Sequence, residues 1–217
     1  MSLFSKLISR EQMEETGTST FDLFNTELGD EHYYTGMELS RRGQYEQAVR
    51  EFKKAAAKYP DNAGTHFNMG VAYDMMGQFN LSIKAYQQAI RLQPDYAEAY
   101  NNLGLAHSNA GDPVEAVKAL VVAVRLNPSF VEALNNLGLI YFNWGRYAEA
   151  IKAYEKAIKI KPDYAQAHYS LGLVYLDLQD EANSRCRYEA LQKLDAALAA
   201  NLLLHIKDTF RSFSSTY

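Results

Sequence analysis

The stretch NNLGLAHSNAGDPVEAVKALVVAVRLNP, residues 101–128, returns 34 residues later as NNLGLIYFNWGRYAEAIKAYEKAIKIKP, residues 135–162. Two residue types keep the same step along most of the chain: Gly36, Gly70, Gly104, Gly138 and Gly172, and Pro60, Pro94, Pro128 and Pro162. A fixed period of this length is typical of solenoids, in which one small unit stacks on copies of itself. The repeat therefore predicts a single array.

Each unit reads as two amphipathic helices. With the periodic glycine at position 8, the units span 29–62, 63–96, 97–130, 131–164 and 165–198, with residues 1–28 before them and 199–217 after them. Positions 4, 7, 8 and 11 follow the spacing of one helix face, and positions 20, 24 and 27 follow that of a second helix. A second series of glycines falls between the two helices, where a helix end favours a left-handed residue: Gly43, Gly77, Gly111 and Gly145. The proline then ends the second helix.

Three of the first helices are preceded by pairs with capping-box spacing. These pairs are Asp95 with Glu98, Ser129 with Glu132, and Asp163 with Gln166. In a capping box the first side chain accepts a hydrogen bond from the opening turn of the helix. We therefore expect Asp95, Ser129 and Asp163 to cap these helices.

The motif N-N-L-G-L-A-H, followed by A-V-K-A-L and N-P, resembles the tetratricopeptide repeat, and its copies cover about four-fifths of the chain. The resemblance implies an all-α fold, a right-handed superhelical solenoid of antiparallel helix pairs. The fifth unit departs from the motif, because Gln179 replaces the turn glycine and Ala196 replaces the proline. We expect its second helix to run on irregularly. Residues 196–210, apolar on one side, are expected to form a C-terminal capping helix over the last unit.

The composition excludes several classes. A net charge of −4 gives no reason to expect nucleic acid as a partner. Cys186 is the one cysteine, so no intramolecular disulfide is possible, which fits a reducing compartment. No run approaches the roughly 20 apolar residues that span a bilayer. We expect a cytoplasmic protein without an integral membrane segment.

The sequence shows no catalytic motif. It lacks a phosphate loop, paired metal-binding cysteines and a nucleophile elbow, so we expect no enzyme activity, no cofactor and no metal. His32, His66 and His168 stand at position 4 and His107 at position 11, which are packing positions of the repeat. Cys186 lies between two arginines that could depress its pKa, but a half-buried small residue explains it more simply.

The resemblance places positions 2, 5, 6, 9, 12 and 13 on the concave groove. The predicted binding residues are Tyr33, Phe67, Asn68, Val71, Asn101, Asn102, Leu105, Asn135, Asn136, Leu139 and Tyr169. An asparagine amide can pair with a peptide main chain whatever the side chains of the ligand. Asn68, Asn102 and Asn136 would form a ladder similar to the asparagine ladder of the nucleocytoplasmic glycosyltransferase that modifies serine and threonine. Alternatively, asparagine is simply common at this position, and the apolar row at position 9 packs helix against helix.

The charge of the groove limits the kind of partner segment that it can bind. The first helices of units two to five contain no lysine or arginine, and the groove carries acidic residues, among them Glu98, Glu132 and Asp177. Only Arg41 matches the family's carboxylate-clamp positions, so an acidic tail or nucleic acid would meet like charge. We expect a neutral or basic partner segment with apolar side chains.

These features predict a non-catalytic scaffold or adaptor, with a monomer favoured. The alternatives are a scaffold that self-assembles through its solenoid ends and an accessory domain of an enzyme complex. Residues 1–28 carry a short apolar stripe at positions 3, 4, 7 and 8, and we expect this segment to contact the first unit or the groove.

Overall fold

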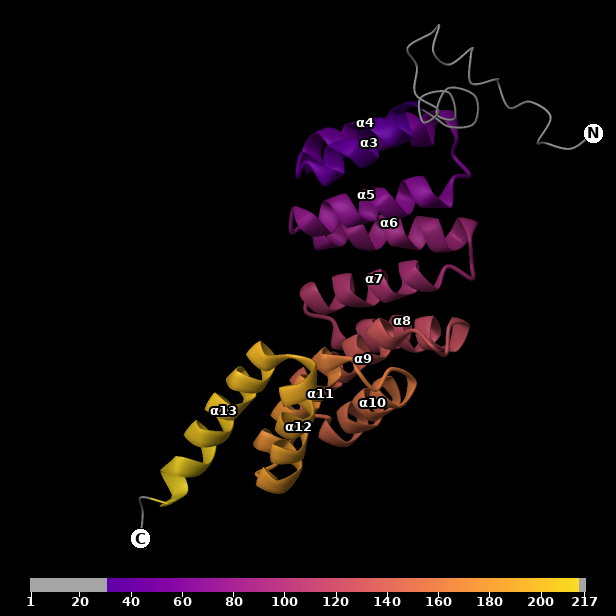
Figure 1. Ribbon diagram of the computed structural model, residues 1–217. Coiled ribbons are helices and arrows are strands. Elements are labelled where there is room, and N and C mark those ends of the chain that lie inside the picture. Colours follow the sequence, from indigo (N-terminus) through magenta and orange to yellow (C-terminus); the bar gives the residue numbers. More distant parts are fainter. Residues whose placement is uncertain (1–30, 215–217) are drawn as a thin grey trace, which may run out of the picture. The chain divides into compact units, whose positions relative to one another are not determined.

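The computed structural model describes residues 31–214, with side chains described as far as Phe210, and these residues form α-helices without a β-strand (Figure 1). The expected contact of residues 1–28 with the array lies outside the described residues. The chain divides into two compact units, residues 1–92 and 93–217, which are described separately below. The helices of the first unit are α3 (Glu31–Arg41), α4 (Tyr45–Lys58), α5 (Ala63–Met75) and α6 (Phe79–Leu92). The helices of the second unit are α7 (Ala97–Asn109), α8 (Pro113–Leu126), α9 (Val131–Asn143), α10 (Tyr147–Ile160), α11 (Ala165–Asp177), α12 (Glu181–Leu194) and α13 (Ala196–Ser214).

Both units are built from helical hairpins. In the first unit α3 packs on α4 and α5 on α6, and α4 joins the two hairpins by packing on α5. Its core gathers Ala48, Phe52, Met69, Ala72 and Tyr73. In the second unit α7–α8, α9–α10 and α11–α12 are stacked in the same way. The predicted helix pairs therefore form within each unit.

The periodic glycines allow two helices of a hairpin to touch. A Cβ atom added to Gly70 would lie 2.6 Å from the ring of Tyr86, and one added to Gly138 would lie 2.7 Å from the ring of Tyr154. Both tyrosine side chains are fully buried. Glycine stands at position 8 because the aromatic ring of the second helix occupies the space of a side chain.

The turns between paired helices need a left-handed residue. Gly43, Gly77, Gly111 and Gly145 have φ between 69° and 86°, as the glycine series predicts. The fifth turn keeps this conformation without a glycine, because Gln179 has φ 59°. The backbone geometry of the turn is thus retained where the sequence departs from the motif.

Replacing Gln179 by glycine is expected to raise the free energy of unfolding by about 0.5–1 kcal/mol. The left-handed conformation costs a residue with a Cβ atom about 1–2 kcal/mol, and part of that gain is lost to the greater freedom of glycine in the unfolded chain. The Gln179 amide makes only a long 3.4 Å contact with the Leu176 carbonyl, so little else changes. Thermal and urea unfolding provide the measurement.

Two further variants control this prediction. Gln179→Asn should fall between glutamine and glycine, because asparagine tolerates the left-handed region better. Gly145→Ala, at the equivalent turn, should lower stability by about 1 kcal/mol. A Gln179→Gly variant that is less stable than the parent would contradict the interpretation.

The predicted capping boxes are wrong. The N-cap residues of α7, α9 and α11 are Tyr96, Phe130 and Tyr164, and none of them makes a side-chain cap hydrogen bond. Phe130 and Tyr164 pack against the hydrophobic core. Burial of an aromatic ring is worth more than a cap, about 1.5–3 against about 1 kcal/mol, so packing decides where α9 and α11 begin.

The second helix of the fifth hairpin is regular, which corrects the expectation of an irregular one. α12 ends at Leu194 and has 14 residues, the same length as α10. Asp195 adopts an extended conformation, and its carboxylate accepts hydrogen bonds from the N–H groups of Ala197 and Leu198 at 2.9 and 3.0 Å. An aspartate that caps the next helix thus separates α12 from α13 without a proline.

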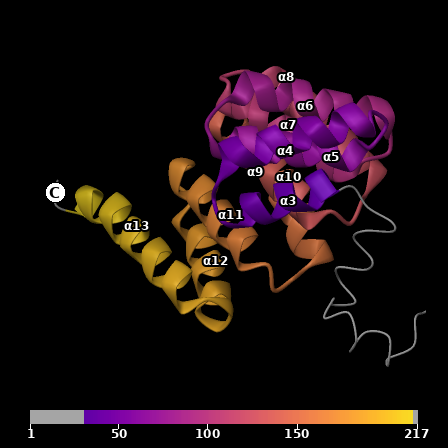
Figure 2. The ribbon, with the colours of Figure 1, turned by 90° about the horizontal axis from the view of Figure 1, so that it is seen from above.

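The expected C-terminal capping helix is present as α13, which lies beside α12 (Figure 2) and packs on both α11 and α12. Leu202 and Ile206 are fully buried in a cluster with Leu176 and Leu191. A Cβ atom added to Gly172 would lie 2.6 Å from Leu202. Leu202 therefore packs on the position-8 glycine, as the second-helix residue does in the other units. Because α13 begins at Ala196, the predicted boundary between residues 198 and 199 falls inside it.

Candidate functional site

Two neighbouring helices of the second unit present the same row of residues. Glu98, Asn102 and Leu105 follow one another on α7, and Glu132, Asn136 and Leu139 occupy the same places on α9. Their spacing of i, i+4 and i+7 puts each set on a single helix face. These six residues, called the amide strip below, carry acidic, amide and aliphatic groups in that order. Leu139 is 41% exposed, and the asparagines are half-buried.

Hydrogen bonds hold the asparagines in place. Asn136 Nδ2 donates to Asn101 Oδ1 on the neighbouring helix at 2.9 Å. Asn101 Nδ2 in turn donates to Asn102 Oδ1 at 3.0 Å. Asn101 is only 7% exposed and serves as the link between α7 and α9. The Asn136 amide is thus oriented by an N–H group, which leaves its carbonyl oxygen as an acceptor.

Asn135 lies inside the helix packing. Its side chain is 7% exposed, and Oδ1 has no hydrogen-bond partner. By the repeat, its donor would come from residue 170, as Asn101 receives its donor from Asn136. That residue is Ser170, which is shorter than asparagine. The asparagine row therefore stops at the fifth repeat.

The equivalent residues of the first unit contact one another as well. Asn68 Nδ2 donates to the Tyr33 hydroxyl oxygen at 3.0 Å. Burial raises the pKa of Tyr33, and the Asn68 hydrogen bond opposes that shift. Phe67 packs on Tyr86 with ring centres 5.8 Å apart, and Val71 is half-buried.

The last predicted binding residue, Tyr169, is covered by the capping helix. Tyr169 and Leu173 pack against the cluster that contains Leu202 and Ile206 of α13. Leu173 stands at position 9, the place that Leu139 holds in the amide strip. The fifth repeat thus uses these positions for packing, while α9 leaves Leu139 exposed.

Basic side chains are distributed unequally between the two helices of each hairpin in the second unit. In the second unit α7, α9 and α11 contain Glu98, Glu132 and Asp177 and no lysine or arginine. Their partners α8, α10 and α12 carry both signs, including Lys118 and Lys156. The two helices that carry the amide strip therefore have acidic side chains and no lysine or arginine.

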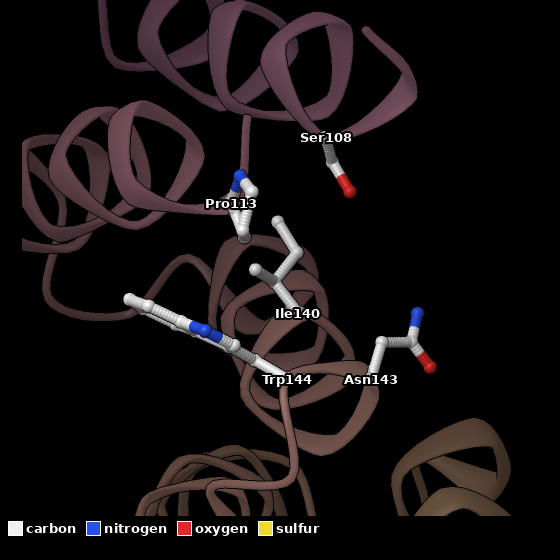
Figure 3. A pocket seen from close by; sticks show the side chains of 5 residues that line it. All are labelled: Ser108, Pro113, Ile140, Asn143 and Trp144. Carbon is white, nitrogen blue, oxygen red and sulfur yellow. The ribbon is translucent and has the colours of Figure 1, made fainter. Parts of the chain in front are cut away.

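A cavity of about 250 Å³ opens near the C-terminal end of α9 (Figure 3). Ser108, Pro113, Ile140, Asn143 and Trp144 line it. In the picture Ile140 stands between Pro113 and Trp144 on one side and Ser108 and Asn143 on the other. Ile140 is buried, whereas Trp144, the one tryptophan of the chain, is 41% exposed.

The sequence did not predict this cavity. Ser108 and Asn143 stand at positions 12 and 13, which the resemblance assigns to the groove, so the sequence indicated two of the lining residues. Nothing in the sequence predicts that Pro113, which opens α8, and Trp144, which follows α9, converge on Ile140.

The indole of Trp144 is in contact with a cation. The guanidinium carbon of Arg146 lies 5.4 Å from the centre of its indole ring and 5.1 Å from that of Tyr141. Arg146 also pairs with Glu149, and this hydrogen bond lowers the pKa of the Glu149 carboxyl. The contact is of cation–π type and limits the movement of the indole.

The titratable groups near the hairpin cores have structural partners. His168 Nε2 lies 2.9 Å from the Pro162 carbonyl oxygen, and His66 makes the equivalent contact with Pro60 at 3.4 Å. The Tyr86 hydroxyl donates to Asp74 Oδ2 at 2.7 Å, while burial raises the pKa of Asp74. These contacts join helices and loops and do not converge on a cavity.

One buried tyrosine of the second unit lacks such a partner. Burial raises the pKa of Tyr154 to about 12, and its hydroxyl lies close to Ser170 without a well-aligned hydrogen bond. It stands at the repeat position of Tyr86, whose acceptor Asp74 is replaced by Phe142 in this hairpin. The Tyr154 ring is therefore present for packing, and its hydroxyl has no side-chain acceptor at the place that Asp74 occupies for Tyr86.

The described residues contain neither a metal-ligand cluster nor a membrane-spanning helix. In residues 31–214 no three histidine, cysteine, aspartate or glutamate side chains gather as a metal site would require. None of the helices from α3 to α13 has both the length and the apolar character that crossing a membrane demands. Cys186 is exposed, which corrects the expectation of a half-buried residue, and its sulfur accepts a hydrogen bond from Arg187 at 3.2 Å.

Family models cover most of the described residues. A model described as TPR repeat matches residues 36–77, 75–111 and 139–179. Two models described as tetratricopeptide repeat match residues 120–152 and 97–130. No curated protein matches the sequence.

Solved structures agree with the family models. A crystal structure of MamA shares 30% sequence identity with a TM-score of 0.69, and the match covers 76% of this chain and 96% of that one. MamA from Desulfovibrio magneticus RS-1, residues 41 to the end, shares 21% identity with a TM-score of 0.70, covering 76% and 94%. YrrB, described as a TPR protein with an unusual peptide-binding site, shares 20% identity with a TM-score of 0.64, covering 88% and 95%.

The repeat of the sequence, the helical hairpins of each unit and the family models lead to one assignment. The predicted fold class, an all-α solenoid of antiparallel helix pairs with a C-terminal capping helix, is confirmed. The chain belongs to the tetratricopeptide-repeat family, whose members bind protein or peptide partners.

Proposed function

We propose that this protein is a non-catalytic adaptor that binds an extended segment of a partner protein on the amide strip of α7 and α9. The observation that carries the proposal is the Asn136 amide. Its N–H group is engaged by Asn101, so its oxygen is oriented to accept a main-chain N–H from a ligand. Leu139 beside it supplies exposed apolar surface for a ligand side chain.

The strip has the properties that recognition of an extended chain requires. Main-chain hydrogen bonds give affinity without regard to ligand sequence, and neighbouring apolar contacts add selectivity. YrrB, whose fold this chain shares, is described as having a peptide-binding site, which supports a peptide as the type of ligand. We propose that Asn68 and Val71 play the same part in the first unit.

Charge defines the partner further. Glu98 and Glu132 lie at the start of the strip, and α7 and α9 have no lysine or arginine to balance them. An acidic segment or a phosphate backbone would meet like charge there. The proposed partner segment is neutral or basic.

We further propose that the protein is a cytoplasmic monomer without catalytic activity. The titratable groups near the hairpin cores are explained by packing, which supports a role without catalysis. The single cysteine fits a reducing compartment such as the cytoplasm. We expect a monomer, and the mass measured by size-exclusion chromatography at several concentrations would separate it from a self-assembling scaffold.

The proposal is tested by replacing Asn102 and Asn136 with alanine. A partner is first identified by pull-down and mass spectrometry, and its affinity is then measured by calorimetry. Two lost hydrogen bonds of about 0.5–1.5 kcal/mol each should weaken binding by about fivefold to 150-fold. Because few charges take part, the affinity should also depend only weakly on salt.

Folding has to be followed in the same experiment. Loss of Asn136 leaves the buried Asn101 oxygen without a donor, which should cost about 1–3 kcal/mol of stability. Binding is therefore compared below the melting transition of each variant. Asn80→Ala and Asn201→Ala change exposed asparagines away from the strip and should bind as the parent does. A folded double variant with the parent's affinity would contradict the proposal.

A further inference from the structure

We propose that the cavity at the end of α9 is the specificity pocket of this protein, and that it takes one uncharged apolar side chain, of about the size of leucine, from a partner segment that also carries a basic residue. The inference rests on the proposed function. It adds the residues that select the partner, whereas the amide strip accounts only for binding a main chain.

The size of the cavity limits its occupant. Its volume of about 250 Å³ is below the range of about 300–1,000 Å³ in which drug-sized ligands and cofactors bind. A single amino-acid side chain is the occupant that such a space accommodates. A free small molecule would have few groups to hold it there.

The lining limits the chemistry of the occupant. Pro113, Ile140 and the indole of Trp144 are apolar, and Ser108 and Asn143 supply neutral hydrogen-bonding groups. None of the five lining residues is charged. A charged side chain would lose its water without gaining a partner, so an aliphatic or aromatic side chain is favoured.

The pocket is preformed. Arg146 lies against the indole of Trp144 from one side, and Ile140 is fixed in the helix packing. A pocket whose walls are held in place loses little conformational entropy when it is filled. This distinguishes Trp144 from an exposed aromatic residue without a supporting contact.

The pocket and the amide strip belong to one surface of the second unit. Asn143 follows Glu132, Asn136 and Leu139 at the same helical spacing on α9. Asn143 stands eleven positions after Glu132, which at a rise of 1.5 Å per residue is a distance of about 16.5 Å. An extended peptide rises about 3.3 Å per residue, so about five residues span it.

The charge of α7 and α9 predicts a basic residue in the partner segment, in addition to the apolar one. With its apolar side chain in the pocket, a segment lying along α9 brings a residue about five positions away to Glu132. Glu98 stands at the equivalent place on α7. Because no basic side chain of α7 or α9 neutralises these two carboxylates, the complementary residue of the partner is lysine or arginine.

The test uses short synthetic peptides and the full chain. The first peptide has a glycine and serine background with one leucine and one lysine about five residues apart, in both orders. The second has serine in place of leucine, and the third has glutamate in place of lysine. Trp144 is the only tryptophan, so its fluorescence reports directly on the pocket. Calorimetry gives the affinities.

The leucine peptide is expected to bind at least about tenfold more tightly than the serine peptide, equivalent to about 1.4 kcal/mol, and to change Trp144 emission. Trp144→Ala should remove that preference and leave the weaker affinity of the serine peptide unchanged. The matched control is Leu178→Ala, since Leu178 is the C-cap residue of α11, is 44% exposed and does not line the cavity. The control should keep the full preference. The glutamate peptide should bind more weakly than its lysine parent.

The outcomes separate the pocket from the proposed function. Equal binding of the leucine and serine peptides, or a preference that survives Trp144→Ala, would overturn the pocket and leave the amide strip standing. If the leucine preference holds but Asn102→Ala with Asn136→Ala binds as the parent does, the strip fails and the pocket stands. If none of the peptides binds at millimolar concentration, both are overturned.

Discussion

A chain that ends after Asp195 should lose about 4–8 kcal/mol of the stability of the second unit. The truncation removes Leu202 and Ile206, which are fully buried, and exposes Leu191 and Leu176 beneath them. Burying one large apolar side chain is worth about 1.5–3 kcal/mol, so several such losses remove a large part of the roughly 5–15 kcal/mol that stabilises a typical domain. Thermal unfolding followed by circular dichroism is the measurement.

Two point variants in the intact chain separate packing from chain length. Leu202→Asp places a charge in the core beside Gly172 and should destabilise the unit nearly as much as the truncation. Leu204→Asp makes the same change two residues further along α13, where the side chain is 58% exposed, and should be nearly neutral. If both variants melt like the parent, α13 is not a structural cap. If both are strongly destabilised, charge on the helix and not burial is responsible.

Gly138→Ala should destabilise the protein by about 1–3 kcal/mol even though alanine is the better helix former. The added Cβ atom would lie 2.7 Å from the ring of Tyr154, which is fully buried. Overpacking of this kind forces either the ring or the helix backbone to shift. Urea unfolding of the variant and the parent measures the difference.

The same substitution at another helical glycine provides the control. In Gly64→Ala the new Cβ atom would lie no closer than 3.2 Å to its nearest neighbour, the Asn62 Oδ1 atom. This variant should therefore be close to neutral, because the small shift required of the capping Asn62 side chain offsets the gain in helix propensity. Adding Tyr154→Ala to Gly138→Ala should cost less than the two single changes predict together, because the clash is then absent. Equal effects at Gly138 and Gly64 would contradict the close-packing explanation.

Much of the candidate site could be located from the sequence, but its internal contacts could not. The repeat gives Asn102 and Asn136 equivalent places on their helices, with Leu139 one turn further along, and these residues lie within α7 and α9. The burial of Asn101 and Asn135 was not predictable, because helix spacing does not tell how closely the neighbouring hairpin approaches. The cavity beside Trp144 was not predictable for a similar reason, since its walls come from three separate helix ends.

The sequence by itself determined the helical hairpins, their turns and the family. Glycines and prolines at a period of 34 specify local backbone geometry, which depends on near neighbours and is therefore readable from the chain. The tertiary structure alone decided which contacts those helices make. Aromatic packing moved the starts of α9 and α11 by outweighing the caps, and α13 placed Leu202 on Gly172 where the repeat alone would have placed a residue of α12. Such choices depend on the burial of side chains far apart in the chain, and local propensity does not contain that information.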